Sequence, residues 1–188
     1  MNNEIPSYPF SLQRQAIENL LPHRGDIFAC QHLVVHGPHN FTGSASWSLE
    51  NNFIRGHFPG LPVVPGVLLI ETMAQLAGAG LLSGDPYVRS LPGDQIGVLA
   101  SIRKCAFTHP VAPQSMVEFE IQCRQMGPMA VQVSSKVHAT NTVVAQLEAL
   151  LVYTDRSQLL AFLGESESSR ILKAPDGRNE STSEYSES

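Results

Sequence analysis

The sequence predicts an α+β protein in which an antiparallel sheet of about six strands wraps around one long central helix. Four segments alternate between apolar and polar residues, which is typical of strands with one buried face. Short turn-forming links, Gly127-Pro128 and Thr140-Asn141, join the last three segments, so we expect their strands to be antiparallel neighbours. Residues 66–82 are apolar nearly all round, as in a helix that is enclosed by protein.

The four clear strands begin near Phe41, Val117, Val131 and Ala145. Weaker alternation over residues 27–36 and 95–105 indicates two more strands. The apolar face of such a sheet needs a cover, which the apolar helix provides. An open sheet edge presents unpaired backbone groups, and pairing with a second copy would satisfy them. We therefore expect at least a homodimer.

Two helices are expected. Over residues 12–20 apolar residues recur on one side, and Pro22 stops the helix. The apolar helix over residues 66–82 begins after Pro65, because a proline in the first turn loses no hydrogen bond. The turn-forming residues 83–86 end this helix.

The chain is long enough for one domain with a sizeable core. We expect this domain to span residues 1–156, with residues 1–24 as an N-terminal extension and first helix. Residues 157–188 are acidic and, from about Gly164, rich in Ser and Glu with few large apolar side chains. Such a segment cannot bury enough surface to offset its ordering entropy, so we expect a disordered tail. A regulated or partner-binding tail is the alternative.

Composition excludes several classes of protein. The formal net charge of -5 gives no reason to expect nucleic-acid binding, which needs a surplus of Lys and Arg. Cys30, Cys105 and Cys123 form no CxxC motif, as is usual in a reducing compartment. The N-terminal residues do not resemble a signal peptide, and the most apolar stretch is shorter than the roughly 20 residues of a membrane span. We expect a cytoplasmic protein with no membrane span.

Two residues around the start of the central helix indicate acid–base chemistry. Glu71 lies within the apolar helix, and carboxylates are seldom placed among apolar residues without a partner or a role. Such surroundings favour the neutral carboxylic acid, which can act as a general acid near neutral pH. His57 lies in a loop that Pro59, Pro62 and Pro65 stiffen, and a neutral imidazole is the matching base.

Gly66 supplies a third component. Its backbone N–H, at the helix start, has no intrahelical partner and no side chain beside it, so it can donate to an oxygen that gains negative charge. A base, an acid and such a donor together suit proton abstraction beside a carbonyl, coupled to loss of a hydroxyl. The other histidines lack metal-ligand spacing, so we expect no metal and no cofactor.

These motifs resemble the beta-hydroxyacyl-acyl-carrier-protein dehydratases of fatty acid synthesis, which have a hotdog fold. The matching motifs are LLPHR (20–24), GHFPG (56–60), P-x-x-PGVLLIE (62–71) and MAQLAG (73–78). They occur in order within about residues 12–155. GHFPG alone would be a weak signal, but His57 and Glu71 within the longer pattern make the resemblance specific.

The resemblance implies that His57 takes a proton from C2 and that Glu71 protonates the departing C3 hydroxyl, giving a trans-2-enoyl thioester. It also implies that the two residues come from different subunits of a dimer, and that dimers can assemble into a trimer of dimers. Gly66 would bind the thioester carbonyl, the carbonyl of Val63 would orient the imidazole, and Gln75 would support the acid. No cofactor is implied.

Further contacts are expected on the same grounds. Phe58 and Val67 would contact the substrate, whose acyl chain would lie in an apolar tunnel beside the central helix. Arg103 and Lys104 would receive the acidic surface and phosphopantetheine phosphate of an acyl carrier protein, unless they are an ordinary exposed edge.

Two other functions remain open. A hotdog thioesterase would hydrolyse the thioester, although such enzymes generally lack a His–Glu pair at this spacing. A non-catalytic acyl-binding subunit would act beside an active homologue, although a retired site usually loses one member of the pair. The sequence departs from the family after LPHR and after Pro113, which leaves the acyl chain length open. His23 and Arg24 are expected to cap the end of the first helix.

Overall fold

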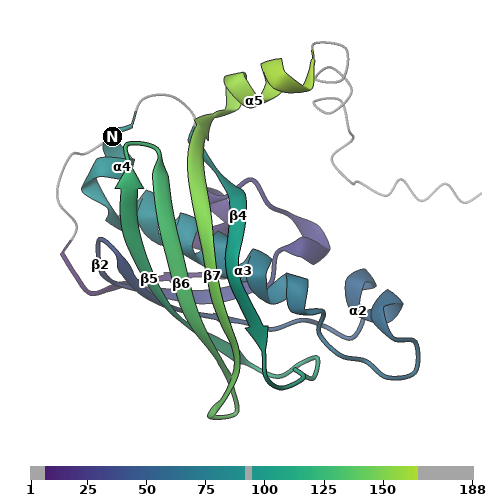
Figure 1. Ribbon diagram of the computed structural model, residues 1–188. Coiled ribbons are helices and arrows are strands. Elements are labelled where there is room, and N and C mark those ends of the chain that lie inside the picture. Colours follow the sequence, from purple (N-terminus) through teal and green to yellow (C-terminus); the bar gives the residue numbers. More distant parts are fainter. Residues whose placement is uncertain (1–6, 92–94, 165–188) are drawn as a thin grey trace, which may run out of the picture.

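The computed structural model describes residues 7–91 and 95–164 (Figure 1). In this part of the chain seven strands form one antiparallel sheet in the order β1-β2-β3-β5-β6-β7-β4. The strands are β1 Phe10–Gln13, β2 Cys30–Gly37, β3 Asn40–Ala45, β4 Gln95–Phe107, β5 Val117–Gly127, β6 Ala130–Ala139 and β7 Thr142–Asp155. The helices are α1 Arg14–Leu20, the 3-10 turn η1 Gly25–Ile27, α2 Asn52–His57, α3 Gly66–Gly84, α4 Pro86–Ser90 and α5 Arg156–Leu163.

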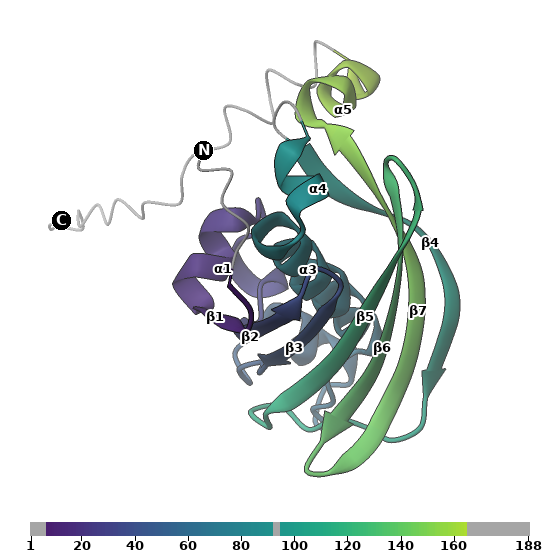
Figure 2. The same cartoon turned by 90° about the vertical axis from the view of Figure 1, so that its left-hand side faces the viewer.

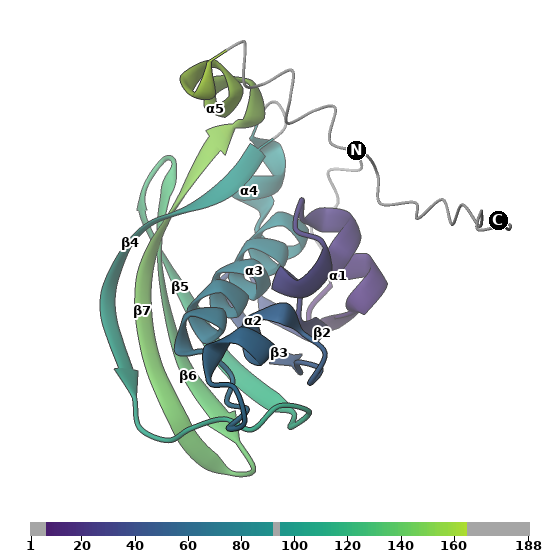
Figure 3. The ribbon, with the colours of Figure 1, turned by 90° about the vertical axis from the view of Figure 1, so that its right-hand side faces the viewer.

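The sheet curves around α3, and α1 lies on the side of α3 away from β5, β6 and β7 (Figure 2). Helix α2 lies at the end of α3 opposite α4 (Figure 3). The predicted arrangement, an antiparallel sheet around one long central helix, is confirmed. It places the end of α2 and the beginning of α3, with their candidate residues, at the same end of the molecule.

The strands of the C-terminal half follow the predicted alternation. In β5, Val117, Phe119 and Ile121 are buried and the residues between them are exposed. Thr140 and Asn141 have φ angles of 47° and 64°, which the turn between β6 and β7 requires. Strand β4 pairs with β7 on one side and forms an edge of the sheet.

Helix α3 forms the centre of the core. Met73 and Leu76 are fully buried, and the sheet packs against them. The helix is long and apolar enough to cross a membrane, but 67% of its most apolar window is buried inside the protein. The helix is apolar because the curved sheet and the rest of the core enclose it.

Gly80 of α3 allows the sheet to approach the helix closely. A Cβ at this position would lie 2.7 Å from the ring of Phe41, which is itself buried. We expect Gly80→Ala to lower the free energy of unfolding by about 1–3 kcal/mol, because the ring has to move within a packed core. Chemical denaturation measures this loss. Gly78→Ala is the matched control, since its Cβ would meet Leu21 at an ordinary 3.7 Å and we expect no loss.

The N-terminal segment differs from the prediction. The sequence predicts a helix over residues 12–20, whereas α1 begins at Arg14 and the preceding residues form β1. Phe10 pairs with Val35, and Leu12 with Leu33 of β2, which adds a seventh strand to the six predicted. The reason is non-local. The backbone groups of residues 10–13 and of β2 satisfy one another by pairing, and the residue pattern of the segment alone does not show that β2 lies beside it.

The C-terminal boundary also differs. The tail is predicted to begin at residue 157, but α5 continues to Leu163. The side chain of Asp155 caps this helix by accepting a hydrogen bond from the backbone N–H of Ser157 at 2.8 Å. Residues 165–188 lie outside the described residues, so a disordered tail there stays a prediction.

Candidate active site

Glu71 lies on α3, and Gln75 holds it one turn further along the helix. The Nε2 of Gln75 donates to Oε1 of Glu71 at 2.9 Å and to the carbonyl of Ile27 at 3.0 Å. The Gln75 side chain is fully buried, and its Oε1 faces the Cys30 thiol at 3.6 Å. Burial raises the pKa of that thiol to about 12, so the thiol stays protonated and can donate. These contacts fix the Gln75 amide with its N–H groups toward Glu71, and the supporting role that the family resemblance implies for Gln75 stays a prediction.

His23 is a second partner of Glu71, which sequence reasoning missed. The prediction assigned His23 and Arg24 to the carbonyls at the end of the first helix. Arg24 does donate to the carbonyl of Leu21 at 2.7 Å, but the His23 side chain turns inward, with Nε2 3.4 Å from Oε1 of Glu71. Burial lowers the pKa of His23, and the negative charge of Glu71 partly offsets this. The LLPHR motif was the available signal.

His57 is the last residue of α2, where the prediction placed a loop. Asn51 starts this short helix: its side chain accepts from the N–H of Phe53 at 3.0 Å and donates to the carbonyl of Asp26 at 2.8 Å. The three intervening prolines still follow His57 and lead to α3. The helix therefore fixes the backbone of His57 more firmly than a loop would.

The imidazole of His57 has a defined tautomer. Its Nδ1 lies 3.2 Å from the carbonyl of Val63, which can only accept, so Nδ1 carries the hydrogen in the neutral ring. The lone pair is then on Nε2, as in a general base. The ring of Phe58 packs on the imidazole, with ring centroids 4.0 Å apart. The Val63 carbonyl is thus placed within reach of the imidazole, and the orienting role that the family resemblance implies stays a prediction.

Gly66 begins α3 directly after Pro65. Its backbone N–H belongs to the first turn, where a helix has no internal acceptor. The Phe107 ring covers the position that a side chain would take, since a Cβ on Gly66 would lie 2.5 Å from it. Val67, the next residue, is two-thirds exposed, and Phe58 is half exposed. Both are therefore accessible for the substrate contact expected of them.

His57 and Glu71 line different hollows in one protomer. A pocket of about 410 Å³ is lined by His57, Gly66 and Val67 together with Phe107 and His109; we call it the His57 pocket. A smaller hollow of about 80 Å³, the Glu71 cavity, lies further along α3. It is lined by Glu71, Gln75 and His23 and by the apolar residues Leu20, Leu21, Ala74, Leu82 and Leu99. A single protomer does not bring the pair into one pocket.

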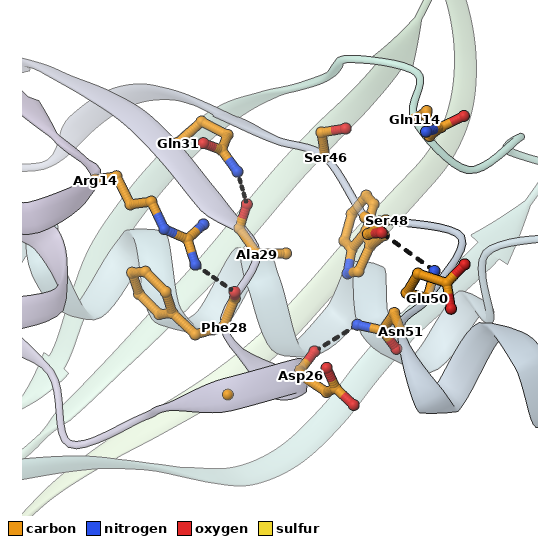
Figure 4. Close-up of a pocket in the computed structure, with 12 residues that line it drawn as sticks. Arg14, Asp26, Phe28, Ala29, Gln31, Ser46, Ser48, Glu50, Asn51 and Gln114 are labelled. Carbon is orange, nitrogen blue, oxygen red and sulfur yellow. Dashed lines mark hydrogen bonds between the residues drawn. The ribbon is translucent and has the colours of Figure 1, made fainter. Parts of the chain in front are cut away.

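A third hollow, of about 530 Å³, is lined in part by the residues that precede α2 (Figure 4). Its polar groups are engaged with each other: Asn51 donates to the carbonyl of Asp26, and Arg14 donates to the carbonyl of Phe28 at 3.3 Å. Arg14 also stacks over the Phe28 ring. We assign these contacts to positioning the start of α2.

Arg103 and Lys104 lie on β4, the exposed edge strand. Lys104 Nζ donates to the side chain of Gln146 at 3.1 Å. Arg103 and Lys104 are both exposed to solvent. In the part of the chain that the structure describes, no group of three or more His, Cys, Asp or Glu side chains could hold a metal ion.

Comparisons with known proteins show the family of the chain. The model of the FabA-like domain family matches residues 36–153. The 3-hydroxyacyl-[acyl-carrier-protein] dehydratase FabZ of Syntrophotalea carbinolica is 30% identical over 145 residues, covering 76% of this chain and 95% of that protein. FabZ of Bacillus pumilus is 31% identical over 121 residues, covering 63% of this chain and 81% of that protein.

A solved structure, the dehydratase heterocomplex ApeI:P from Xenorhabdus doucetiae, superposes with a TM-score of 0.65 at 13% identity. The superposition covers 79% of this chain and 97% of that chain, and it shows a shared fold. The antiparallel sheet that wraps α3, together with the fold shared with this dehydratase, thus defines a hotdog-fold protein. The chain belongs to the FabA-like domain family, which confirms the resemblance inferred from its motifs.

Proposed function

We propose that the protein removes water from 3-hydroxyacyl thioesters on an acyl carrier protein, giving trans-2-enoyl thioesters for fatty acid or related polyketide-type biosynthesis. The observation that supports this most directly is that one chain contains both a His57 imidazole, whose Nδ1 contact with Val63 leaves the lone pair on Nε2, and a Glu71 carboxyl held by Gln75. The similarity to FabZ dehydratases gives the substrate class. We place the reaction in the cytoplasm.

In the proposed reaction, Nε2 of His57 removes a proton from C2 of the substrate. The electron pair forms the double bond to C3, the C3–O bond breaks, and Glu71 protonates the leaving hydroxyl, so that water departs. The N–H of Gly66 donates to the thioester oxygen, which gains negative charge during the step. Phe58 and Val67 would flank the acyl group near the reacting carbons. The residues involved all belong to this chain, and the step as written needs no cofactor.

A homodimer would unite the two hollows. The occupant that we propose for the β4 edge is a second copy of the chain, because β4 is a 13-residue strand whose outer backbone groups are unpaired within the described sheet. Exposed apolar residues accompany this edge, with Ile102 and Phe107 each about half exposed. Antiparallel pairing about a two-fold axis would bring the His57 pocket of one copy toward the Glu71 cavity of the other. Dimers could assemble further into a trimer of dimers.

We assign the carrier-protein contact to Arg103 and Lys104. Both side chains are exposed, and pairing at the β4 edge would use the backbone groups of the strand rather than these side chains. Their positive charge suits an acidic carrier protein and its phosphopantetheine phosphate.

A hydration assay tests the proposal, because the reaction is reversible. Crotonyl thioester, on a carrier protein and separately on coenzyme A, is mixed with the purified protein, and loss of ultraviolet absorbance is followed. We expect hydration to the 3-hydroxyacyl thioester, with preference for the carrier protein, and hydration about 10³-fold slower with Glu71→Gln. Release of free acid and thiol would instead identify a thioesterase. Equal inactivity of wild type and variant would favour a non-catalytic acyl-binding subunit.

The Glu71 cavity is our candidate for the start of the acyl tunnel. Gly78 lines it, so a large side chain there would fill it. We expect Gly78→Leu to reduce turnover of a ten-carbon substrate about 50-fold relative to a four-carbon one, since excluding about three methylenes costs ~0.8 kcal/mol each. Gly78→Ala, which adds one methyl group at an ordinary contact distance, should change this ratio little. An unchanged chain-length profile in Gly78→Leu would place the acyl chain elsewhere.

A further inference from the structure

His23 makes a contact that the proposed mechanism does not yet use. It comes from the segment between α1 and η1, and its Nε2 lies 3.4 Å from Oε1 of Glu71. Gln75, one turn further along α3, donates to the same oxygen at 2.9 Å. Among the residues that the structure describes, no hydrogen bond to Oε2 of Glu71 is present. The two oxygens of this carboxyl are therefore in different environments.

The surroundings of His23 favour the neutral ring. Its Nδ1 is buried and has no hydrogen-bond partner in the described part of the chain. A charged ring would carry a hydrogen on this atom, and an unpaired buried N–H is costly. Burial lowers the pKa of His23, Arg24 lowers it further, and the negative charge of Glu71 opposes both effects. With the hydrogen on Nε2, the neutral ring can donate to Glu71.

The location of the proton on Glu71 follows from this arrangement. Gln75 already donates to Oε1, and a His23 ring turned so that its Nε2–H points at the same oxygen would leave it no direction for a hydrogen of its own. In the protonated carboxyl that the proposed reaction requires, the hydrogen is then on Oε2. At 3.4 Å the His23 contact is longer than an ideal hydrogen bond of about 2.9 Å, as is common for catalytic contacts in unliganded sites, which tighten when substrate binds.

We propose that His23 is a positioning residue: together with Gln75 it holds Oε1 of Glu71, so that Oε2 carries the proton and faces the departing hydroxyl. This inference rests on the proposed dehydratase function. The lining of the Glu71 cavity supports it, because His23 and Glu71 are the titratable side chains among its described residues and the others are apolar or amide groups. Leu21 and Pro22 pack beside them in the same wall, which restricts where the His23 ring can lie.

Two substitutions separate positioning from packing. His23→Leu keeps a side chain of similar bulk and removes the donor, whereas His23→Gln keeps an N–H donor near the place of Nε2. We expect kcat of His23→Leu to fall about 10–100-fold, because a loosely held acid is misplaced at the reacting atoms, while KM changes less than about threefold. His23→Gln should recover kcat to within about fivefold of wild type. In a Glu71→Gln background, His23→Leu should have no further effect, since His23 acts through Glu71.

The outcomes distinguish this inference from the proposed function. If the wild-type protein does not hydrate crotonyl thioesters, the dehydratase proposal fails. If the wild type is active and His23→Leu is equally active, the positioning role is wrong and the dehydratase function stands. Equal losses in His23→Leu and His23→Gln would show that His23 acts by packing, which also overturns the inference. Thermal unfolding verifies that each variant is folded, and His23→Met replaces His23→Leu as the donor-free variant if the latter is not.

Discussion

Replacement of Glu71 by glutamine is expected to lower kcat for crotonyl thioester hydration about 10³-fold, within the range for loss of a general acid or base. In the wild-type protein, Nε2 of Gln75 donates to Oε1 of Glu71 at 2.9 Å. Glutamine has the shape of glutamate, so its carbonyl oxygen can accept this hydrogen bond in the variant. It cannot deliver a proton at the reacting oxygen. The unfolding free energy should therefore change little while turnover is nearly lost.

His57→Asn is the companion variant for the base. An asparagine amide can donate to the carbonyl of Val63 in place of Nδ1, but it has no counterpart of Nε2. We expect a similar loss of about 10³-fold in kcat. Glu120→Gln is the control for removing a carboxylate, because Glu120 is exposed on β5 and pairs with His138. If either site variant kept more than a tenth of wild-type turnover, the acid–base assignment would be wrong.

Combining the two inactive chains in one dimer is expected to restore activity. Co-expression of His57→Asn and Glu71→Gln chains with different tags, followed by purification on both tags, gives heterodimers. If each site takes His57 from one subunit and Glu71 from the other, one site of the heterodimer is wild type and the other lacks both groups. Turnover should then be about half that of the wild-type dimer, since the two sites of a two-fold dimer are equivalent. The increase over either parent is several hundredfold.

The reciprocal heterodimer is the control. It contains one wild-type chain and one chain with both substitutions, so a site shared between subunits always lacks one group and stays inactive. A site built within one subunit would give the opposite pattern, with activity in the control and none in the first heterodimer. Gel filtration checks that both are dimers. The two results together decide whether the His57 pocket and the Glu71 cavity, which are separate in one protomer, join across an interface.

The sequence by itself predicted the parts of the protein whose signals are local. Alternation identified β5, β6 and β7, because each strand has one buried and one exposed face. Continuous apolar character and Pro65 identified α3 and its beginning. His57 and Glu71 were proposed from the sequence because an acid within an apolar helix and a histidine followed by three closely spaced prolines are both unusual. Gln75 was named from the family resemblance, and its place four residues after Glu71 on a helix brings the two side chains together.

Only the tertiary structure decided the features that depend on distant parts of the chain. Strand β1 exists because β2 has a free edge, and α2 begins where Asn51 is anchored to Asp26, far from it in sequence. The inward turn of His23 toward Glu71 also depends on α3, since the preceding helix alone suggested a capping role. Such contacts form when chain segments meet in the folded state, and a pattern read along one segment contains no record of the segment that it will meet.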